Sequence, residues 1–262
     1  MYNFDVSCSL PSHSLETRKR TKAQLSRSRQ RQLNDNMAPI ALEPTPVPIH
    51  GIVTKTLYGN GATIETLPKT SKRIASYRGY DHVGWWVGNA KQAAAFYIAR
   101  MGFERIAYRG LETGSKVVAS HVIRNGDVTF ILTSPLHTPD AKVAWLTDDD
   151  RALLKEIHDH LRAHGDAVRD VAFEVDDVTA VYDAAVAKGA YPVDGPKTIS
   201  DNFGATKLAS IKTYGDTIHT LVERRQYSGA FLPGYRAVTE IDKTAKYLPQ
   251  VDLLAIDHCV GE

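Results

Sequence analysis

The chain carries the same short strand-opening pattern three times, and this repeat limits the fold more than any other feature of its 262 residues. The three copies begin at Tyr80-Asp81-His82-Val83, Val168-Arg169-Asp170-Val171 and Ile256-Asp257-His258-Cys259. His82 and Asp170 are separated by as many positions as Asp170 and His258. A repeat on this scale indicates supersecondary units that pack against one another, so the elements after each copy should also repeat.

The first repeat unit, residues 80–134, predicts the order strand, helix, strand, strand, strand. Apolar residues alternate from Val83 to Val87, which is the period of a strand. Asn89 can cap the helix that follows, and Gly102 is a suitable end for it. Asn125-Gly126 between two apolar runs is a strong signal for a hairpin turn. The three further strands are predicted over Arg105–Tyr108, Val117–Ile123 and Val128–Thr133.

The second repeat unit, residues 168–225, predicts the same order of elements. Apolar residues alternate from Val171 to Val175, either Asp176 or Asp177 can cap the next helix, and Gly189 can end it. Its remaining strands are predicted near Tyr191–Val193, Thr206–Lys212 and Thr217–Val222, and a charged helix over about Asp149–Ala163 separates the two units. Together the units predict an α+β fold in which paired βαβββ units form one half-barrel domain.

The rest of the chain is predicted to flank that domain, which we place at residues 73–226. Residues 1–72 are predicted to be a disordered leader, basic at first and proline-rich later. The basic, serine-containing start is typical of an organellar transit peptide, and a plain extension before Met37 is the alternative. Residues 227–252 are predicted to be a linker, and residues 253–262 the truncated start of a third unit.

Composition excludes several classes of function. The net charge of +2 gives no reason to expect a nucleic-acid partner. No apolar run approaches the roughly 18–20 residues that span a bilayer, so no membrane partner is expected. The two cysteines, Cys8 and Cys259, lie near opposite ends of the chain, which favours a reducing compartment over a disulfide framework. We therefore expect a cytoplasmic protein.

Paired βαβββ units suggest the vicinal oxygen chelate architecture, whose metal ligands lie on the first strand of each unit and near the end of the last. The equivalent residues here are His82, Asp170 and Glu223, and a set of this kind can bind a divalent metal. The alternative is that these side chains only form hydrogen bonds and that other side chains fill the pocket. The histidines that fit no ligand spacing are interpreted as structural: His121, His160, His164 and His219.

A resemblance to a known family rests on longer motifs. They are Trp86-Val87-Gly88-Asn89-Ala90, Phe96-Tyr97, Met101-Gly102-Phe103, Ala107-Tyr108-Arg109-Gly110, His164-Gly165-Asp166, Thr213-Tyr214-Gly215-Asp216-Thr217, His219-Thr220-Leu221-Val222-Glu223 and Phe231-Leu232-Pro233-Gly234-Tyr235. With them, the stretch from about residue 77 to residue 261 resembles the 4-hydroxyphenylpyruvate dioxygenases of the fungal and animal type. A match of this length is far more specific than a short motif.

The resemblance implies a non-catalytic N-terminal domain and a C-terminal domain that holds Fe(II) with two histidines and one glutamate. His258 corresponds to the first of these histidines, and Val260 to a residue that lines the substrate pocket. The second histidine and the glutamate correspond to no residue of this chain, which has Glu262 where the family usually has asparagine. Because the family uses no metal in its N-terminal domain, the resemblance disfavours the His82, Asp170 and Glu223 site.

The implied activity converts 4-hydroxyphenylpyruvate and O2 to homogentisate and CO2 in tyrosine and phenylalanine catabolism. Its partners are the aromatic α-keto acid and O2, and the family is typically dimeric. With one iron ligand, the 262-residue chain is expected to be inactive by itself. The alternatives are a part of a hydroxymandelate synthase-like enzyme, a non-catalytic binding or dimerisation module, and a separate metal enzyme that uses His82, Asp170 and Glu223.

Overall fold

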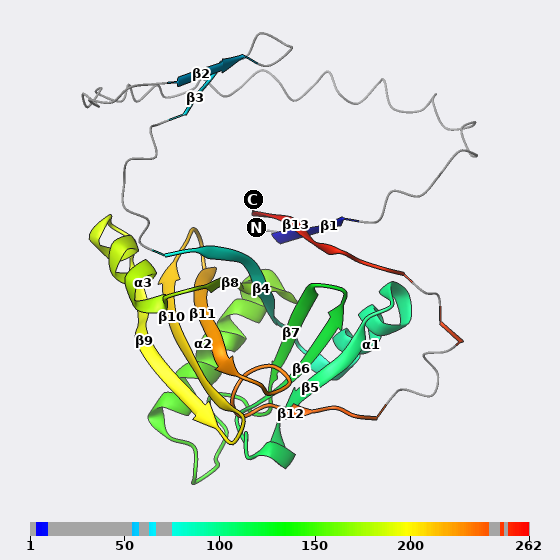
Figure 1. Ribbon diagram of the computed structural model, residues 1–262. Helices are drawn as coiled ribbons and strands as arrows, with labels where there is room; N and C mark the ends of the chain where they lie inside the picture. The colour runs from blue at the N-terminus through cyan, green and yellow to red at the C-terminus, as the bar shows by residue number, and fades with distance from the viewer. Residues whose placement is uncertain are drawn as a thin grey trace, which may run out of the picture. The chain divides into compact units, whose positions relative to one another are not determined.

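The computed structural model describes residues 4–9, 54–57, 63–66, 75–240, 247–248 and 251–261 (Figure 1). The chain divides into two compact parts, one made of Met1–Pro11 with Arg73–Glu262 and the other of Ser12–Lys72. In the second part, β2 (Thr54–Leu57) and β3 (Thr63–Thr66) pair as an antiparallel hairpin. The elements described below belong to the first part.

The first repeat unit forms in the predicted order. It consists of β4 (Tyr77–Trp86), α1 (Ala90–Met101), β5 (Glu104–Arg109), a 3-10 turn η1 (Leu111–Thr113), β6 (Val118–Asn125) and β7 (Val128–Pro135). The Asn89 side chain accepts a hydrogen bond from the Gln92 amide, and Gly102 ends α1 in the left-handed conformation with φ 68°. The predicted cap and the predicted end of this helix are therefore confirmed.

The second repeat unit follows a charged helix, α2 (Asp148–His164). It consists of β8 (Ala167–Val175), α3 (Val178–Ala187), β9 (Pro192–Asp201), β10 (Gly204–Lys212) and β11 (Ile218–Tyr227). Of the two candidate caps for α3, Asp177 is the one that accepts a hydrogen bond, from the Ala180 amide. Strand β9 is much longer than predicted because it is an exposed edge strand, and its polar residues show no apolar alternation.

Nine strands form one curled sheet in the order β12-β5-β6-β7-β4-β8-β11-β10-β9, with β12 (Arg236–Ala237) at one edge. The two repeat units meet where β4 and β8 pair antiparallel. Within each unit the first strand pairs in parallel with the last, β4 with β7 and β8 with β11. Figure 1 shows α1 outside one group of strands and α3 outside the other. The predicted α+β fold of paired βαβββ units is confirmed.

The helix-covered face of the sheet holds two apolar clusters. The cluster beneath α1 contains fully buried side chains such as Val83, Phe103 and Leu132, and the cluster beneath α3 contains Val178 and Ala209. Burying a side chain of the size of Leu132 contributes about 2 kcal/mol, so the sheet is held mainly from this side. No helix among the described residues is long and apolar enough to cross a membrane.

The third copy of the repeat pattern lies on β13 (Ala255–Gly261), which pairs antiparallel with β1 (Phe4–Ser9). In this pairing Ser7 stands opposite His258. A strand at Phe4–Ser9 differs from the disorder predicted for this segment, because its pairing partner is remote in sequence and local periodicity cannot reveal it. The rest of the predicted leader, apart from β2 and β3, lies outside the described residues, and the domain boundaries stay predictions.

Candidate functional site

The predicted set of His82, Asp170 and Glu223 does not come together in the fold. Glu223 lies on the helix-covered side of β11, where its Oε2 accepts a hydrogen bond of 3.1 Å from the Val178 amide at the start of α3. His82 contacts the ring of Phe231, with ring centroids 5.2 Å apart. Within the part of the chain that the structure describes, no group of three or more histidine, cysteine or acidic side chains could hold a metal ion.

His82 is instead part of a buried charge network centred on Asp81. The Asp81 carboxylate lies 2.5 Å from His82 Nδ1 and accepts two hydrogen bonds of 2.6 Å from the Arg224 guanidinium. Burial would raise the pKa of Asp81, but its contacts with His82 and Arg224 outweigh burial and hold that pKa well below 3.8. The network ties the first strand of one unit to the last strand of the other.

Phe231 and Leu232 close the sheet face opposite the helices. Both are buried, and they pack on apolar residues from both repeat units: Ala107, Val122, Ile131, Ala172 and Val222. The Arg224 guanidinium lies 5.4 Å from the centre of the Phe231 ring and also donates to the Phe231 carbonyl. The sequence predicted only a linker here, so the linker's start fills the space in which this architecture would hold a ligand.

Asp170 lies under this closed face. Its Oδ1 accepts a hydrogen bond of 3.0 Å from the Thr220 amide, and burial raises its pKa, although His82 and Thr220 oppose that effect. Gly84 leaves the room that Asp170 needs, because a Cβ at Gly84 would lie 3.2 Å from the Asp170 Cβ. Asp170 is thus a packed, hydrogen-bonded side chain.

His121, interpreted from sequence as structural, has the clearest pH response of the described histidines. Burial lowers its pKa from 6.5 to about 4, and Arg105 and Lys91 add to that effect. The folded chain therefore keeps His121 neutral, and the unfolded chain binds more protons between pH 6.5 and 4. Stability should fall across this window as pH decreases, by about 2 kcal/mol after allowance for solvent screening.

We expect His121→Leu to remove that part of the pH dependence. The measurement is the free energy of unfolding in urea at pH 7, 5.5 and 4, with His137→Leu, a loop histidine, as the control. Equal pH slopes in the wild type and in His121→Leu would contradict the assignment.

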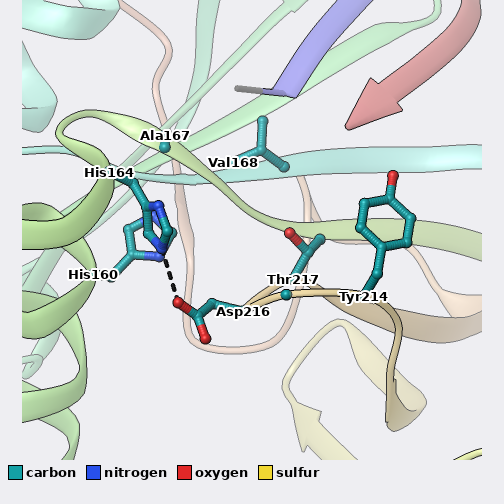
Figure 2. A pocket seen from close by; sticks show the side chains of 8 residues that line it. His160, His164, Ala167, Val168, Tyr214, Asp216 and Thr217 are labelled. Atoms are coloured by element: carbon teal, nitrogen blue, oxygen red, sulfur yellow. Dashed lines mark hydrogen bonds and ion pairs between the residues drawn. The ribbon is translucent and has the colours of Figure 1, made fainter. Parts of the chain in front are cut away.

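A small cavity lies where α2 ends, lined by His160, His164, Ala167, Val168, Tyr214, Gly215, Asp216 and Thr217 (Figure 2). His164 Nε2 lies 2.8 Å from Asp216 Oδ2, which joins the end of α2 to the turn between β10 and β11. The cavity volume is about 20 Å³, which is room for one water and too little for an organic substrate. His160 and His164 therefore fit the predicted structural role.

A larger cleft of about 630 Å³ lies along β4 and β11 and is lined by charged side chains of both signs. Arg78 is paired with Asp176, and Arg224 is paired with Asp81. The charged lining side chains are three arginines and three carboxylates, so the cleft has no strong field of one sign that would attract a charged ligand.

His258 and Val260 lie on β13, outside the half-barrel face closed by Phe231. The His258 side chain is 56% exposed, and its Nδ1 lies 2.8 Å from Asp257 Oδ2. Val260 is 45% exposed. A neighbouring carboxylate on one ring nitrogen leaves the other nitrogen available, which is the usual arrangement of a metal-binding histidine.

Comparison with known proteins identifies the superfamily that shares this fold. The family model of the Glyoxalase/Bleomycin resistance protein/Dioxygenase superfamily matches residues 79–209. The chain belongs to this superfamily. The match runs from β4 into β10, which is the first unit and most of the second, so membership rests on the half-barrel itself.

Within the superfamily the chain is similar to proteins named 4-hydroxyphenylpyruvate dioxygenase. Those of Coccidioides posadasii (strain C735) and Aspergillus fumigatus (strain ATCC MYA-4609 / CBS 101355 / FGSC A1100 / Af293) are each 59% identical over 194 residues, 74% of this chain and 48% of theirs. A solved mutant of 4-hydroxymandelate synthase from Streptomyces coelicolor has 25% identity and a TM-score of 0.50, covering 66% of this chain and 44% of that one. The resemblance found in the sequence is confirmed, and the chain spans about half the length of these curated relatives.

The described residues do not by themselves fit the Fe(II) that the dioxygenase resemblance implies. A facial triad needs two histidines and one carboxylate around the metal. His258 is the one residue assigned to that triad, and its acidic neighbour Asp257 is bonded to the His258 ring instead of being placed as a second ligand.

Proposed function

We propose that this chain is the N-terminal part of an Fe(II)-dependent 4-hydroxyphenylpyruvate dioxygenase, which forms homogentisate and CO2 from 4-hydroxyphenylpyruvate and O2. The observation that carries the proposal is the 59% identity over 194 residues to two relatives of that name. On the same resemblance we propose a homodimeric, cytoplasmic enzyme.

The half-barrel has a structural role in this proposal. Its face opposite the helices is filled by Phe231 and Leu232, and the nearby charges of Asp81 and Arg224 neutralise each other. Side chains therefore fill the face where this architecture would hold a ligand, and the neighbouring cleft has no strong field of one sign that would attract a keto acid. The domain instead carries β13, and with it His258, at its margin.

His258 is the residue that we assign to iron, as the first of the family's three ligands. Its exposed imidazole can donate one nitrogen to the metal, and Asp257 orients the ring through Nδ1. Val260 is assigned to the wall of the substrate pocket, for which its exposed side chain is suited. When bound by the complete triad, the iron would supply the oxygen chemistry of the reaction.

The 262-residue chain alone should form no homogentisate when purified and supplied with Fe(II), ascorbate and 4-hydroxyphenylpyruvate. One protein ligand cannot hold the metal in a catalytic geometry. Oxygen uptake and product chromatography are the measurements, with the Coccidioides posadasii relative as the positive control. Iron-dependent homogentisate formation by this chain would show that its ligand set is complete without the family's other two residues.

A chimera tests the proposed activity itself. Residues 1–261 of this chain, joined to the C-terminal part of the Coccidioides posadasii relative, should form homogentisate. The substitution His258→Ala should reduce its turnover and its iron content to background, whereas His137→Asn in a surface loop should not. A folded chimera with no product, or one that releases hydroxymandelate, would count against the proposal.

A further inference from the structure

The turn between β6 and β7 holds the segment that leads into β13. Asn125 Nδ2 donates to the carbonyl of Val251 at 2.6 Å and to the carbonyl of Met101 at 2.8 Å. Asn125 Oδ1 accepts from the amide of Leu253 at 3.1 Å. One side chain therefore uses both donors and its acceptor, and it joins the end of α1 to two residues of a segment far away in sequence.

Backbone contacts around Asn125 extend this clamp. The Asp127 amide donates to the Leu254 carbonyl at 3.1 Å. Gly126 has φ 56°, and a Cβ there would lie only 1.9 Å from the Leu253 carbonyl oxygen. Gly102 also lies close to the segment, because its Cβ would lie 2.9 Å from the Val251 carbonyl oxygen. The close approach of the segment thus requires glycine on both sides of the clamp.

Apolar packing continues from the clamp into β13. Leu253 and Ile256 are 5% and 8% exposed, and both belong to the cluster beneath α1. Cys259 also packs against this cluster. The segment from Val251 to Ile256 is therefore docked on the first repeat unit by hydrogen bonds and by two buried side chains.

We propose that Asn125 is a positioning residue that sets the place and register of β13, and through it the place of His258. His258 follows Leu253 by a few residues of extended strand, so a shift at Leu253 is passed along the strand to His258. The docking of the Val251–Ile256 segment follows from these contacts alone. Only the consequence for His258 as a metal ligand rests on the proposed function.

The competing explanation is that Asn125 only favours the hairpin turn. Asn-Gly is a preferred pair in such turns whatever lies beside them. The two explanations differ in what a substitution disturbs. A turn residue affects the β6–β7 ladder, whereas a positioning residue affects the Val251–Ile256 segment while the ladder stays intact.

Hydrogen exchange of the whole chain, read by mass spectrometry, separates these roles. In Asn125→Ala we expect about tenfold faster exchange at the amide of Leu253, because that amide loses its hydrogen bond to Asn125 Oδ1. Exchange at Ala209, in the core of β10, should be unchanged. The matched control is Asn202→Ala, an exposed asparagine in the β9–β10 turn, which should leave the Val251–Ile256 segment as in the wild type.

A second variant covers the case in which Asn125→Ala does not fold. Asn125→Asp keeps the size and the acceptor but replaces the donor with an oxygen that faces the carbonyls of Met101 and Val251, so it should also speed exchange at Leu253.

In a Cys8→Ser background, both variants should raise the rate of Cys259 modification by a thiol reagent several-fold. Exchange that increases only in β6 and β7, with Leu253 and Cys259 unaffected, would overturn the proposal. None of these measurements involves turnover, so they stand apart from any failure of the proposed function.

Discussion

Replacing Phe231 by alanine is expected to lower the free energy of unfolding by about 3–5 kcal/mol, the largest effect of any single change considered for this chain. Phe231 is 2% exposed, and its ring contacts His82 and Tyr235 at centroid distances of 5.2 Å. Its removal leaves a cavity between residues that come from both repeat units. Because those residues lie on a rigid sheet, the cavity cannot readily collapse.

Urea unfolding of Phe231→Ala against wild type provides the test, with Phe203→Ala as the matched control. Phe203 is 59% exposed in the turn between β9 and β10, so the same change in chemistry should cost well under 1 kcal/mol there. If Phe231→Ala cost no more than Phe203→Ala, the closed face of the sheet would not be a folding core. The interpretation that Phe231 fills the space where this architecture would hold a ligand would then be contradicted.

The sequence predicted the local features of the fold well because each depends on a few neighbouring residues. The Asn89 cap and the Gly102 helix end lie where predicted, and the hairpin turn predicted at Asn125-Gly126 lies one residue further on, at Gly126-Asp127. Strand β9 was predicted at less than its full length because an edge strand has no buried face to impose alternation.

The candidate metal set failed for a reason of strand geometry. Successive residues of a strand point to opposite faces, so an error of one position moves a side chain across the sheet. Val222 packs on the closed face and Glu223 therefore turns to the helix side, where it bonds to α3. Sequence position alone could not determine which face of the sheet each side chain occupies, because the strand pairing contains register shifts at Tyr80–His82 and Ala205–Lys207.

The contributions of Phe231 and Asn125 to the site could not have been predicted either. Phe231 lies in a segment without periodic structure, and the partners of Asn125 are remote in sequence. One signal was available, since the Phe231–Tyr235 motif was part of the family resemblance although it lies outside every predicted strand and helix. A specific motif in an apparent linker is thus a reason to expect tertiary packing.

The Asp81 network links the two repeat units of the half-barrel. Asp81 takes two hydrogen bonds from Arg224 and a third contact from His82, so its charge is matched within the protein. Arg224 in turn reaches the Phe231 carbonyl. The closed face therefore depends on one charge network and one aromatic ring that support each other.

We expect Asp81→Leu to lower the free energy of unfolding by about 3 kcal/mol, because it leaves the Arg224 guanidinium without its buried partner. The Asp81 and Arg224 side chains are 3% and 24% exposed. In Asp81→Leu, water can therefore hydrate the unpaired guanidinium only in part. The double variant Asp81→Leu/Arg224→Met should recover much of the loss, since apolar residues can replace a buried ion pair at little cost. Equal losses in the single and double variants would contradict this account.

The same network predicts the direction of a pH effect. The pKa of Asp81 is held below its ordinary value of 3.8, so its stabilisation is present above that pH and is lost as pH falls toward the folded-state value. In urea unfolding between pH 5 and 2.5, Asp81→Leu should therefore lose stability less steeply than the wild type. Parallel acid profiles for the two proteins would show that the Asp81 carboxylate gains nothing from His82 and Arg224 on folding.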